Sequence, residues 1–193
     1  MPDKKRVIFV ISAFVFALFF SAFAFKVVGQ LKQSAENQKH SYDIMHQANV
    51  LLSTLMDVEI GQREFLLTGN ELELEPTLTL LQNIPTLLEE LRGKNILTAA
   101  VKHLDAVAPL IAVKLTNISN EIDLRRIIDS LPPFSLATEK ESAQLSASIR
   151  SELGSFIEVE EKAIEQIDVT FQENLRKSVA VFVLTIIITY VFI

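Results

Sequence analysis

The chain has 193 residues, 49% of them hydrophobic, and carries 24 acidic and 18 basic side chains but no cysteine. Without cysteine the fold has no disulfides, so its stability must come from packing. The acidic excess is concentrated between residues 27 and 175, where 23 acidic side chains outnumber 12 basic ones. An acidic surface repels phosphate groups, which argues against a nucleic-acid partner.

The chain begins with a predicted membrane segment. Residues 7–25, VIFVISAFVFALFFSAFAF, carry no charge and are long enough to cross the roughly 30 Å hydrocarbon core of a bilayer. The basic residues within 1–6 place the amino terminus in the cytoplasm by the positive-inside rule. The alternative is a signal peptide cleaved near Ala22-Phe23-Ala24, although the apolar run is longer than such peptides usually have. In either case the following residues leave the cytoplasm.

Residues 26–177 are predicted to form an all-α domain outside the cytoplasm. Gly69 and Gly93 suit the end of a helix, and Asn70 and Asn95 suit the start of the next one. Apolar residues between these turns recur at intervals of three and four, and no run alternates as a strand would. The expected helices run to about residue 68, over 71–92, from 95 to before 132, and from about 138 onward. They predict an up-down-up-down four-helix bundle.

A second apolar run closes the sequence. Residues 178–193, SVAVFVLTIIITYVFI, follow Arg176 and Lys177 and predict a second transmembrane helix. The run is shorter than the roughly 20 residues that a spanning helix needs. The expected helix is therefore either truncated or ends at the far edge of the bilayer.

The third predicted helix has the most regular apolar pattern in the chain. Its expected core positions follow one another by three and four residues. They are Leu97, Val101, Leu104, Ala108, Ile111, Leu115, Ile118 and Ile122. The next position in this series is Arg125, so an arginine is expected at the end of the core.

The first helix has a broad apolar face made of two rows. One row repeats every seven residues and consists of Ile44, Leu51, Val58 and Phe65. We predict that this row is the seam of a parallel homodimer. The alternative is that both rows face neighbouring helices of a single bundle.

The other row of the first helix contains Met45, Leu52, Leu55, Met56 and Leu66. At 100° per residue, Glu59 and Arg63 fall in the middle of this stripe rather than on the opposite face. Buried charges need partners. Counting 1.5 Å per residue along each helix brings Arg125 and Arg150 towards the same distal end. We therefore predict a polar cluster of Glu59, Arg63, Arg125 and Arg150.

The predicted cluster has two interpretations. It is either a buried ion network that fixes the alignment of the helices, or a pocket for a small anionic ligand. The second interpretation follows from its composition, because one acid against three arginines leaves positive charge, and arginine suits carboxylate recognition. Glu160, with Glu161 beside it, is expected at a separate polar site nearer the membrane.

The stretch DVEIGQREFLLTGN, which ends the first predicted helix, resembles a family motif. The motif is Asp-x-Glu-Thr-Gly-Gln-Arg-Gly-Tyr-Leu-Leu-Thr-Gly of the third class of CHASE domains, the cyclase/histidine-kinase-associated sensory extracellular domains. The matching polar and glycine positions are Asp57, Glu59, Gly61, Gln62, Arg63, Thr68 and Gly69. The sequence departs from the motif at Ile60, Glu64 and Phe65, and Arg150, Glu160 and Glu161 resemble further family positions.

The resemblance implies a sensory module outside the cytoplasmic (inner) membrane of a bacterium, with its main domain in the periplasm or the extracellular space. Such modules signal through the second membrane helix to a histidine kinase, a cyclic-dinucleotide enzyme or a chemotaxis-type output. The sequence shows no output domain after Ile193. The alternative is therefore a membrane-anchored scaffold that pairs with a full-length receptor and modulates it. The expected partners are the membrane and a second chain, either a copy or a receptor.

The sequence gives no indication of catalysis. His40 and His46 are six residues apart and do not share a helix face, and His103 stands alone, so none suggests a metal site. No Gly-rich phosphate loop and no nucleophile–histidine–acid set has a supporting spacing. We expect no enzyme activity, no metal and no cofactor.

Overall fold

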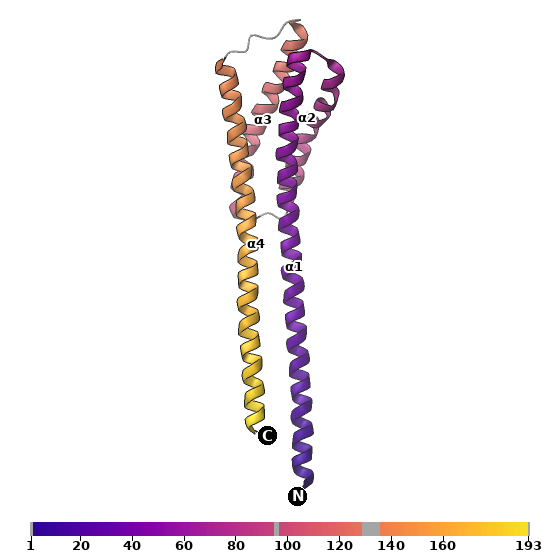
Figure 1. Cartoon of the computed structure of the whole chain (residues 1–193), viewed down its shortest axis with the longest axis vertical. Helices are drawn as coiled ribbons and strands as arrows, with labels where there is room; N and C mark the ends of the chain where they lie inside the picture. Colours follow the sequence, from indigo (N-terminus) through magenta and orange to yellow (C-terminus); the bar gives the residue numbers. More distant parts are fainter. Residues whose placement is uncertain (1, 95–96, 129–135, 193) are drawn as a thin grey trace. The chain divides into compact units, whose positions relative to one another are not determined.

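A computed structural model of the chain describes the backbone of residues 2–94, 97–128 and 136–192, and the side chains of 14–94, 97–128 and 139–187. The regular structure of these residues is α-helical (Figure 1). The helices are α1 (Pro2–Thr68), α2 (Glu71–Arg92), α3 (Thr98–Ile127) and α4 (Leu136–Phe192). The predicted all-α class is confirmed for this part of the chain, as are the predicted end of α1 and both ends of α2.

The helices form two compact units, which are described separately. The paired-helix unit consists of Met1–His40 and Ala163–Ile193, and the four-helix unit consists of Ser41–Lys162. Both α1 and α4 contribute to both units, whereas α2 and α3 belong to the four-helix unit.

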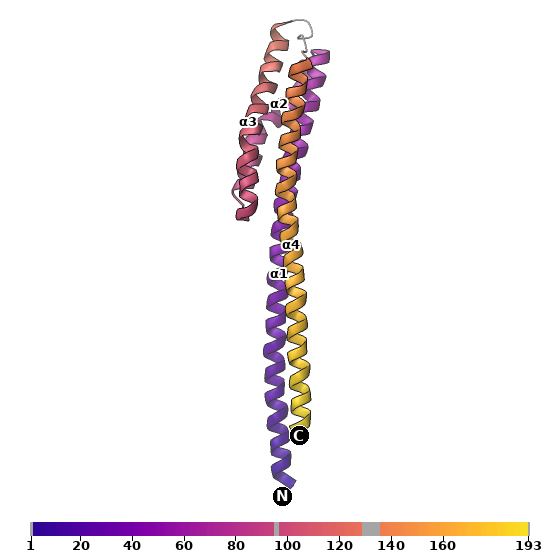
Figure 2. The same ribbon diagram turned by 90° about the vertical axis from the view of Figure 1, so that its left-hand side faces the viewer.

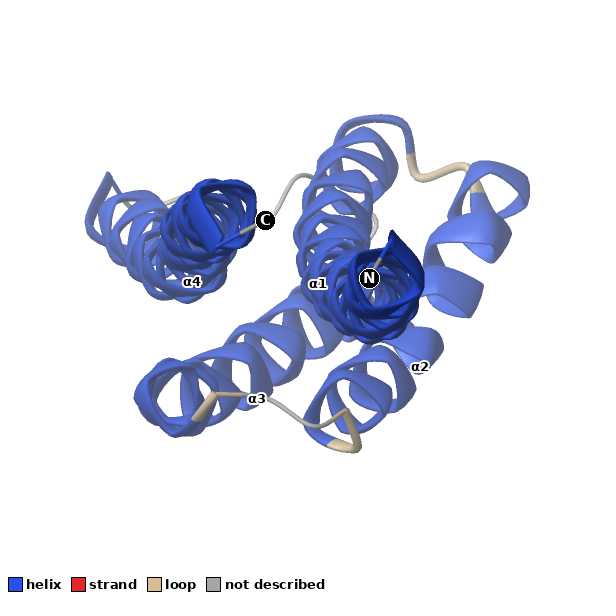
Figure 3. Cartoon of the chain, turned by 90° about the horizontal axis from the view of Figure 1, so that it is seen from below, coloured by secondary structure: helices blue, strands red, loops and turns tan. Residues whose placement is uncertain are grey.

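Successive helices of the four-helix unit run in opposite directions (Figures 1 and 2). This is the up-down-up-down connection expected for helices joined by short turns. Figure 3 views the helices nearly end-on. All four helices contribute to one apolar core, which includes Leu51, Val58 and Phe65 of α1, Leu74, Ile84 and Leu91 of α2, Leu104, Ile111 and Ile118 of α3, and Leu153 and Phe156 of α4.

The row predicted as a dimer seam lies inside this core. Ile44, Leu51, Val58 and Phe65 are each at most 2% exposed. The assignment of this row to a dimer seam is therefore wrong, because the other helices of the same bundle already cover it. These residues, spaced by seven, instead mark the centre of the face that α1 buries in its own bundle. The expected pairing with a second copy or with a receptor stays a prediction.

The buried row of α3 differs from the predicted one. It consists of Ala100, Leu104, Val107, Ile111, Lys114, Ile118 and Ile122. Of the predicted positions, Leu97 and Val101 are exposed, and Ala108 and Leu115 are half-buried. The prediction is confirmed at Leu104, Ile111, Ile118 and Ile122, which both rows share. Between these positions the buried row passes through Val107 and Lys114 instead of Ala108 and Leu115.

Helices α1 and α2 approach each other closely at Gly61. A Cβ atom on Gly61 would lie 1.9 Å from Oγ1 of Thr77, which is itself buried. Real Cβ atoms do not come so close to another heavy atom, so a larger residue would force the two helices apart. This motif glycine therefore has a packing role.

The turn between α1 and α2 is built as predicted. Gly69 adopts a φ of 68°, in the left-handed region that favours glycine. Its N–H donates to the carbonyl oxygen of Phe65 at 2.7 Å. Asn70 then caps α2, because its Oδ1 accepts a hydrogen bond of 3.1 Å from the N–H of Leu72.

In the paired-helix unit, α1 and α4 lie side by side (Figures 1 and 2). The ring of Phe182 on α4 lies 6.1, 5.5 and 5.2 Å, centroid to centroid, from the rings of Phe16, Phe20 and Phe23 on α1. These separations are typical of aromatic pairs. The clustered rings hold the two helices together.

Many apolar side chains of the paired-helix unit face outward. Phe14 is 66% exposed, Phe25 83% and Ile187 54%. Within the residues that the structure describes, one helix is long and apolar enough to cross a membrane, and it is the stretch Phe14–Thr68 of α1. The predicted second span ends in residues 188–193, whose side chains lie outside the described residues.

Candidate functional site

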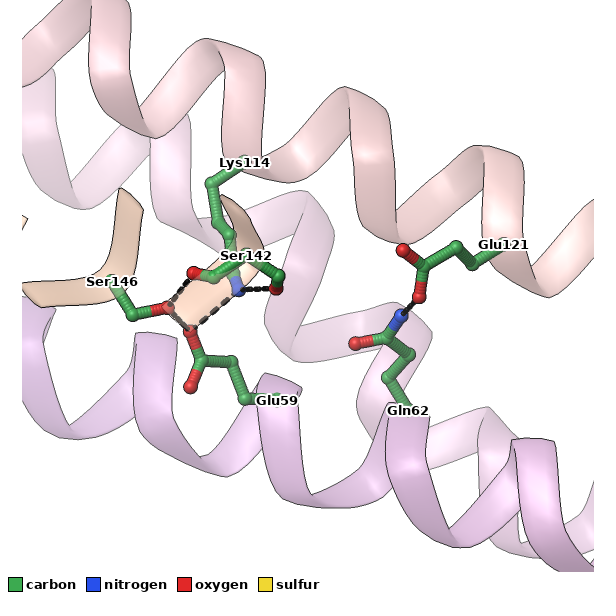
Figure 4. Close-up of polar contacts among 6 residues, drawn as sticks. All are labelled: Glu59, Gln62, Lys114, Glu121, Ser142 and Ser146. Carbon is green, nitrogen blue, oxygen red and sulfur yellow. Dashed lines mark hydrogen bonds and ion pairs between the residues drawn. The ribbon is translucent and has the colours of Figure 1, made fainter. Parts of the chain in front are cut away.

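The most prominent polar feature of the four-helix unit is a lysine in its core. The side chain of Lys114 is 5% exposed and occupies the buried row of α3. Its Nζ lies 2.9 Å from Oε1 of Glu59 on α1 and donates a hydrogen bond of 2.8 Å to Oγ of Ser142 on α4 (Figure 4). One ammonium group therefore connects three helices.

The hydroxyl of Ser146 completes this core polar cluster, which we define as Glu59, Lys114, Ser142 and Ser146. Ser146 lies one turn after Ser142 on α4, and its Oγ donates to Oε1 of Glu59. The same hydroxyl lies 3.0 Å from the carbonyl oxygen of Ser142. The carboxylate of Glu59 is thus held by a charged and a neutral donor from two different helices.

Two opposing effects act on the carboxyl group of Glu59. Burial disfavours its charged form and would by itself raise its pKa. The hydrogen bonds from Ser146 and Lys114, with the positive charges of Lys114 and Arg63, outweigh that effect. The pKa of Glu59 therefore lies below the ordinary value of 4.5, and the group is ionised at neutral pH.

A second interhelical contact lies close to the core polar cluster. The side chain of Gln62 is buried, and its Nε2 donates to Oε2 of Glu121 on α3 (Figure 4). Because Gln62 follows Glu59 by about one turn, the two contacts join α1 to α3 at successive levels. The motif positions Glu59 and Gln62 thus both hold α3 against α1.

Arg125 has a different role from the one predicted. Its Nε donates to the carbonyl oxygen of Leu66 at 3.1 Å, and its Nη1 donates to that of Ile128 at 3.2 Å. Leu66 belongs to the last turn of α1, where carbonyl groups have no partner within the helix. The guanidinium also packs on Gly69, where an added Cβ would lie 2.7 Å from Nη2. Arg125 therefore caps the carboxyl end of α1.

The structure does not bring together the predicted cluster of Glu59, Arg63, Arg125 and Arg150. Arg63 and Arg150 are exposed, and Arg125 binds carbonyl oxygens. The predicted rotation of α1 was wrong because its buried row passes through Gln62 and Phe65, which turns Arg63 outward. Both interpretations of the predicted cluster required these four side chains to converge. Of the four, only Glu59 takes part in the buried polar network, and its partners there are Lys114 and Ser146.

The predicted separate site at Glu160 and Glu161 divides into a buried and an exposed residue. Glu160 is 1% exposed, and its Oε1 lies 3.4 Å from the backbone N of Leu97, which donates to it. Leu97 occupies the N-cap position of α3 and has no polar side chain for that role. A carboxylate from α4 thus lies at the positive end of the α3 dipole. Glu161 is exposed.

The remaining motif residues lie on the surface or in the turn. Asp57 is exposed, and Thr68 donates from Oγ1 to the carbonyl oxygen of Glu64 at 2.9 Å. The same hydroxyl accepts a hydrogen bond of 3.2 Å from the N–H of Asn70. Thr68 therefore stabilises the end of α1 together with Gly69.

The histidines do not form a metal centre in the described part of the chain, where no group of three ligand-type side chains converges. His103 instead pairs with Glu152 of α4, at 2.7 Å between Nδ1 and Oε2. This contact adds another connection between α3 and α4.

Sequence reasoning missed Lys114, Ser142 and Ser146. The available signal was the spacing of Lys114, three residues after Ile111 and four before Ile118, both of which were expected in the core. Ser142 and Ser146 are four residues apart, which places two hydroxyls on one face of α4.

Comparison with known protein families gives a match for the chain. The CHASE3 domain matches residues 34–168, which include α2, α3 and the whole core polar cluster. A search of curated proteins and of solved structures gave no match. The match covers more than half of the chain and agrees with the motif described above. The chain therefore belongs to the CHASE3 family, whose members are sensory extracellular domains of signalling proteins.

Proposed function

We propose that the chain is a membrane-anchored, extracytoplasmic sensory module of bacterial signal transduction. The observation that carries this proposal is the position of the CHASE3 match, whose first residues lie on the same helix, α1, as the segment long and apolar enough to cross a membrane. A sensory domain continuous with a membrane helix is suited to pass a conformational change to that helix.

The proposed orientation follows from charge. Basic residues within 1–6 precede the first apolar segment, which places the amino terminus in the cytoplasm. The four-helix unit then lies outside the cytoplasmic membrane, and α4 returns the chain through residues 178–193 as a second membrane helix. The binding event that starts the signal is that of a small ligand or of a partner protein on the four-helix unit.

The proposed relay uses the contacts between α1, α3 and α4. A ligand shifts a conformational equilibrium by its difference in affinity for the two states. The core polar cluster connects both helices that continue into the paired-helix unit, α1 through Glu59 and α4 through Ser142 and Ser146. A change in this cluster is therefore expected to alter the packing of α1 against α4.

Cysteine labelling tests the membrane topology, because the chain has no cysteine of its own. In intact bacterial cells, a membrane-impermeant maleimide should label the variant Ser53→Cys, whose position on α1 is exposed. The variant Lys4→Cys should be labelled only after the cells are broken. Labelling of Lys4→Cys before lysis, or protection of Ser53→Cys, would contradict the proposed topology.

A chimeric kinase tests the relay. Residues 1–193 are joined to the cytoplasmic part of a histidine kinase, and autophosphorylation is measured in membranes. We expect Lys114→Met, which breaks the core polar cluster, to change the phosphorylation rate. The matched variant Lys102→Met, at an exposed position of α3, should leave the rate unchanged. Equal rates in the parent and both variants would contradict a relay through the cluster.

A further inference from the structure

The paired-helix unit contains a groove between α1 and α4. Its volume is about 410 Å³, within the range of about 300–1,000 Å³ that small-ligand sites occupy. Phe19 and Phe23 of α1 and Phe182 of α4 line it. The rings of Phe23 and Phe182 are stacked, with 5.2 Å between centroids and 16° between planes. One wall of the groove is therefore aromatic.

Polar side chains line the same groove. They are Lys26 of α1 and Lys177 and Ser178 of α4, and the lining residues in the described part of the chain include no acidic one. Lys26 directly follows the apolar segment 7–25, and Lys177 directly precedes the apolar run 178–193. Both positive charges thus lie at the same end of the two apolar segments, beside an apolar wall.

The two ammonium groups are available to a ligand. Among the described residues, Lys26 makes no ion pair with another side chain. Lys177 pairs with Glu173 on its own helix at 3.3 Å, with the two side chains 73% and 65% exposed. Exposed ion pairs between residues four apart on a helix stabilise it only slightly, so this pair is easily broken. An anionic ligand in the groove can therefore recruit both lysines.

We propose that this groove binds one anionic phospholipid of the surrounding bilayer. The lipid phosphate lies between Lys26 and Lys177 and accepts a hydrogen bond from Ser178, and an acyl chain covers the aromatic wall. The proposal rests on the proposed function, because it requires the paired-helix unit to lie in a membrane. In the proposed topology both lysines lie at the extracytoplasmic end of the apolar segments, and two ammonium groups there attract an anionic headgroup by simple electrostatics.

The combination of charge and apolar surface selects a phospholipid. A soluble anion would occupy the lysine end and leave the wall of Phe19, Phe23 and Phe182 uncovered. A zwitterionic lipid covers the wall, but its own cation opposes the two lysines. An anionic phospholipid satisfies both parts, and it is present in the bilayer at high local concentration.

Binding at this place has a consequence for signalling. The groove lies where α1 and α4 meet, so an occupied groove stabilises one packing of these helices over another. The content of anionic lipid would then set the balance on which a signal from the four-helix unit acts.

Lipid retention measured by native mass spectrometry tests the proposal. The full chain is purified in detergent with equal amounts of dioleoyl phosphatidylglycerol and dioleoyl phosphatidylcholine. We expect the parent to retain the anionic lipid over the zwitterionic one by about 30-fold. Each of the two lysines is expected to raise the affinity for an anionic lipid by about a factor of five. The double variant Lys26→Gln, Lys177→Gln should lose this preference.

Control variants distinguish lipid binding in the groove from non-specific attraction to positive charge. The double variant Lys32→Gln, Lys39→Gln removes the same charge from exposed positions of α1 outside the groove, and should keep the preference. Ala22→Trp fills the groove while keeping both lysines, and should abolish retention. Ala17→Trp adds the same bulk at an exposed position that does not line the groove, and should leave retention unchanged.

Three results would overturn the proposal. Equal retention of both lipids by the parent, with the chain still in carbonate-washed membranes, contradicts the lipid groove but leaves the membrane-anchored function intact. Removal of the chain from membranes by carbonate contradicts both. Displacement of phosphatidylglycerol by an equimolar amount of oleate assigns the groove to single-chain anionic amphiphiles rather than to a phospholipid.

Discussion

Lys114 of α3 and Glu59 of α1 form an ion pair of 2.9 Å in the interior of the four-helix unit. Removing one partner of a buried pair leaves the other charge without compensation, at a cost of about 3–5 kcal/mol. Glu59 keeps some contact with water, at 22% exposure of its side chain, so the lower end of that range applies. The pair is therefore a sensitive point for the stability of the bundle.

Our first prediction concerns this pair. Lys114→Met should lower the free energy of unfolding by about 3 kcal/mol, measured by urea denaturation of the full chain in detergent. The double variant Glu59→Leu, Lys114→Met should recover most of the loss, because no unpaired charge remains. A double variant as unstable as Lys114→Met alone would show that the unpaired carboxylate of Glu59 is not the cause of the loss.

The second prediction concerns acid. Because the pKa of Glu59 is lower in the folded chain than its ordinary value of 4.5, its contribution to stability is present above that pH and is lost as the pH falls through the folded value. The stability difference between the parent and Glu59→Gln should be constant from pH 7 to about pH 5 and should shrink below about pH 4.5. The measurement is thermal unfolding over this pH range.

Taking the stability difference between the parent and Glu59→Gln excludes the contributions of other carboxyl groups with a lowered pKa. Hydrogen bonds from Arg126 lower the pKa of Glu71, and a hydrogen bond from Lys162 lowers that of Glu158, in both proteins alike. Their acid dependence cancels in the difference. A difference that grows as the pH falls below 4.5 would contradict the assignment to Glu59.

The third prediction concerns the cap on α1. Arg125→Met keeps the length of the side chain but removes both hydrogen bonds to carbonyl oxygens. We expect a loss of about 1.5–3 kcal/mol, typical of hydrogen bonds made by charged groups. Hydrogen exchange should show faster opening of the last turn of α1, around Leu66. The matched variant Arg150→Met, at an exposed position of α4, should unfold like the parent.

The fourth prediction concerns the contact between α1 and α2. Gly61→Ala should destabilise the bundle by about 1–3 kcal/mol, because its Cβ overlaps Thr77. Thr77→Ala removes the hydroxyl that lies 1.9 Å from the added Cβ and should partly restore stability. The Cβ of residue 77 would still be 3.0 Å away, so the rescue is incomplete. Equal stability of Gly61→Ala with and without Thr77→Ala would rule out this clash.

The sequence predicted those parts of the fold that depend on local chemistry. Gly69 and Asn70 were predicted to end α1 and cap α2, and their backbone conformation and hydrogen bonds confirm this. Such residues can be recognised in a sequence because their role is local: glycine takes the left-handed conformation that ends a helix, and asparagine accepts a hydrogen bond from the first turn of the next helix. The helical class was equally readable from apolar residues spaced by three and four.

The partners of charged residues could not be predicted in the same way. Glu59 was expected to face the interior, but its partner, Lys114, lies on another helix. The meeting of the two depends on how α1 and α3 rotate against each other, which many apolar contacts decide together. A lysine can also lie among leucines because its long apolar stem packs as they do, so its letter alone does not show burial.

The position of Lys114 in a row of isoleucines determines which movements of α3 the bundle tolerates. Sliding α3 along α1 by one turn would place Ile111 or Ile118 against the carboxylate of Glu59 and leave the ammonium among apolar groups. Tilting α3 about the pair keeps both charges together. Sliding of α3 along α1 is therefore disfavoured. We expect the domain to respond to its stimulus by a change in the angle between these helices.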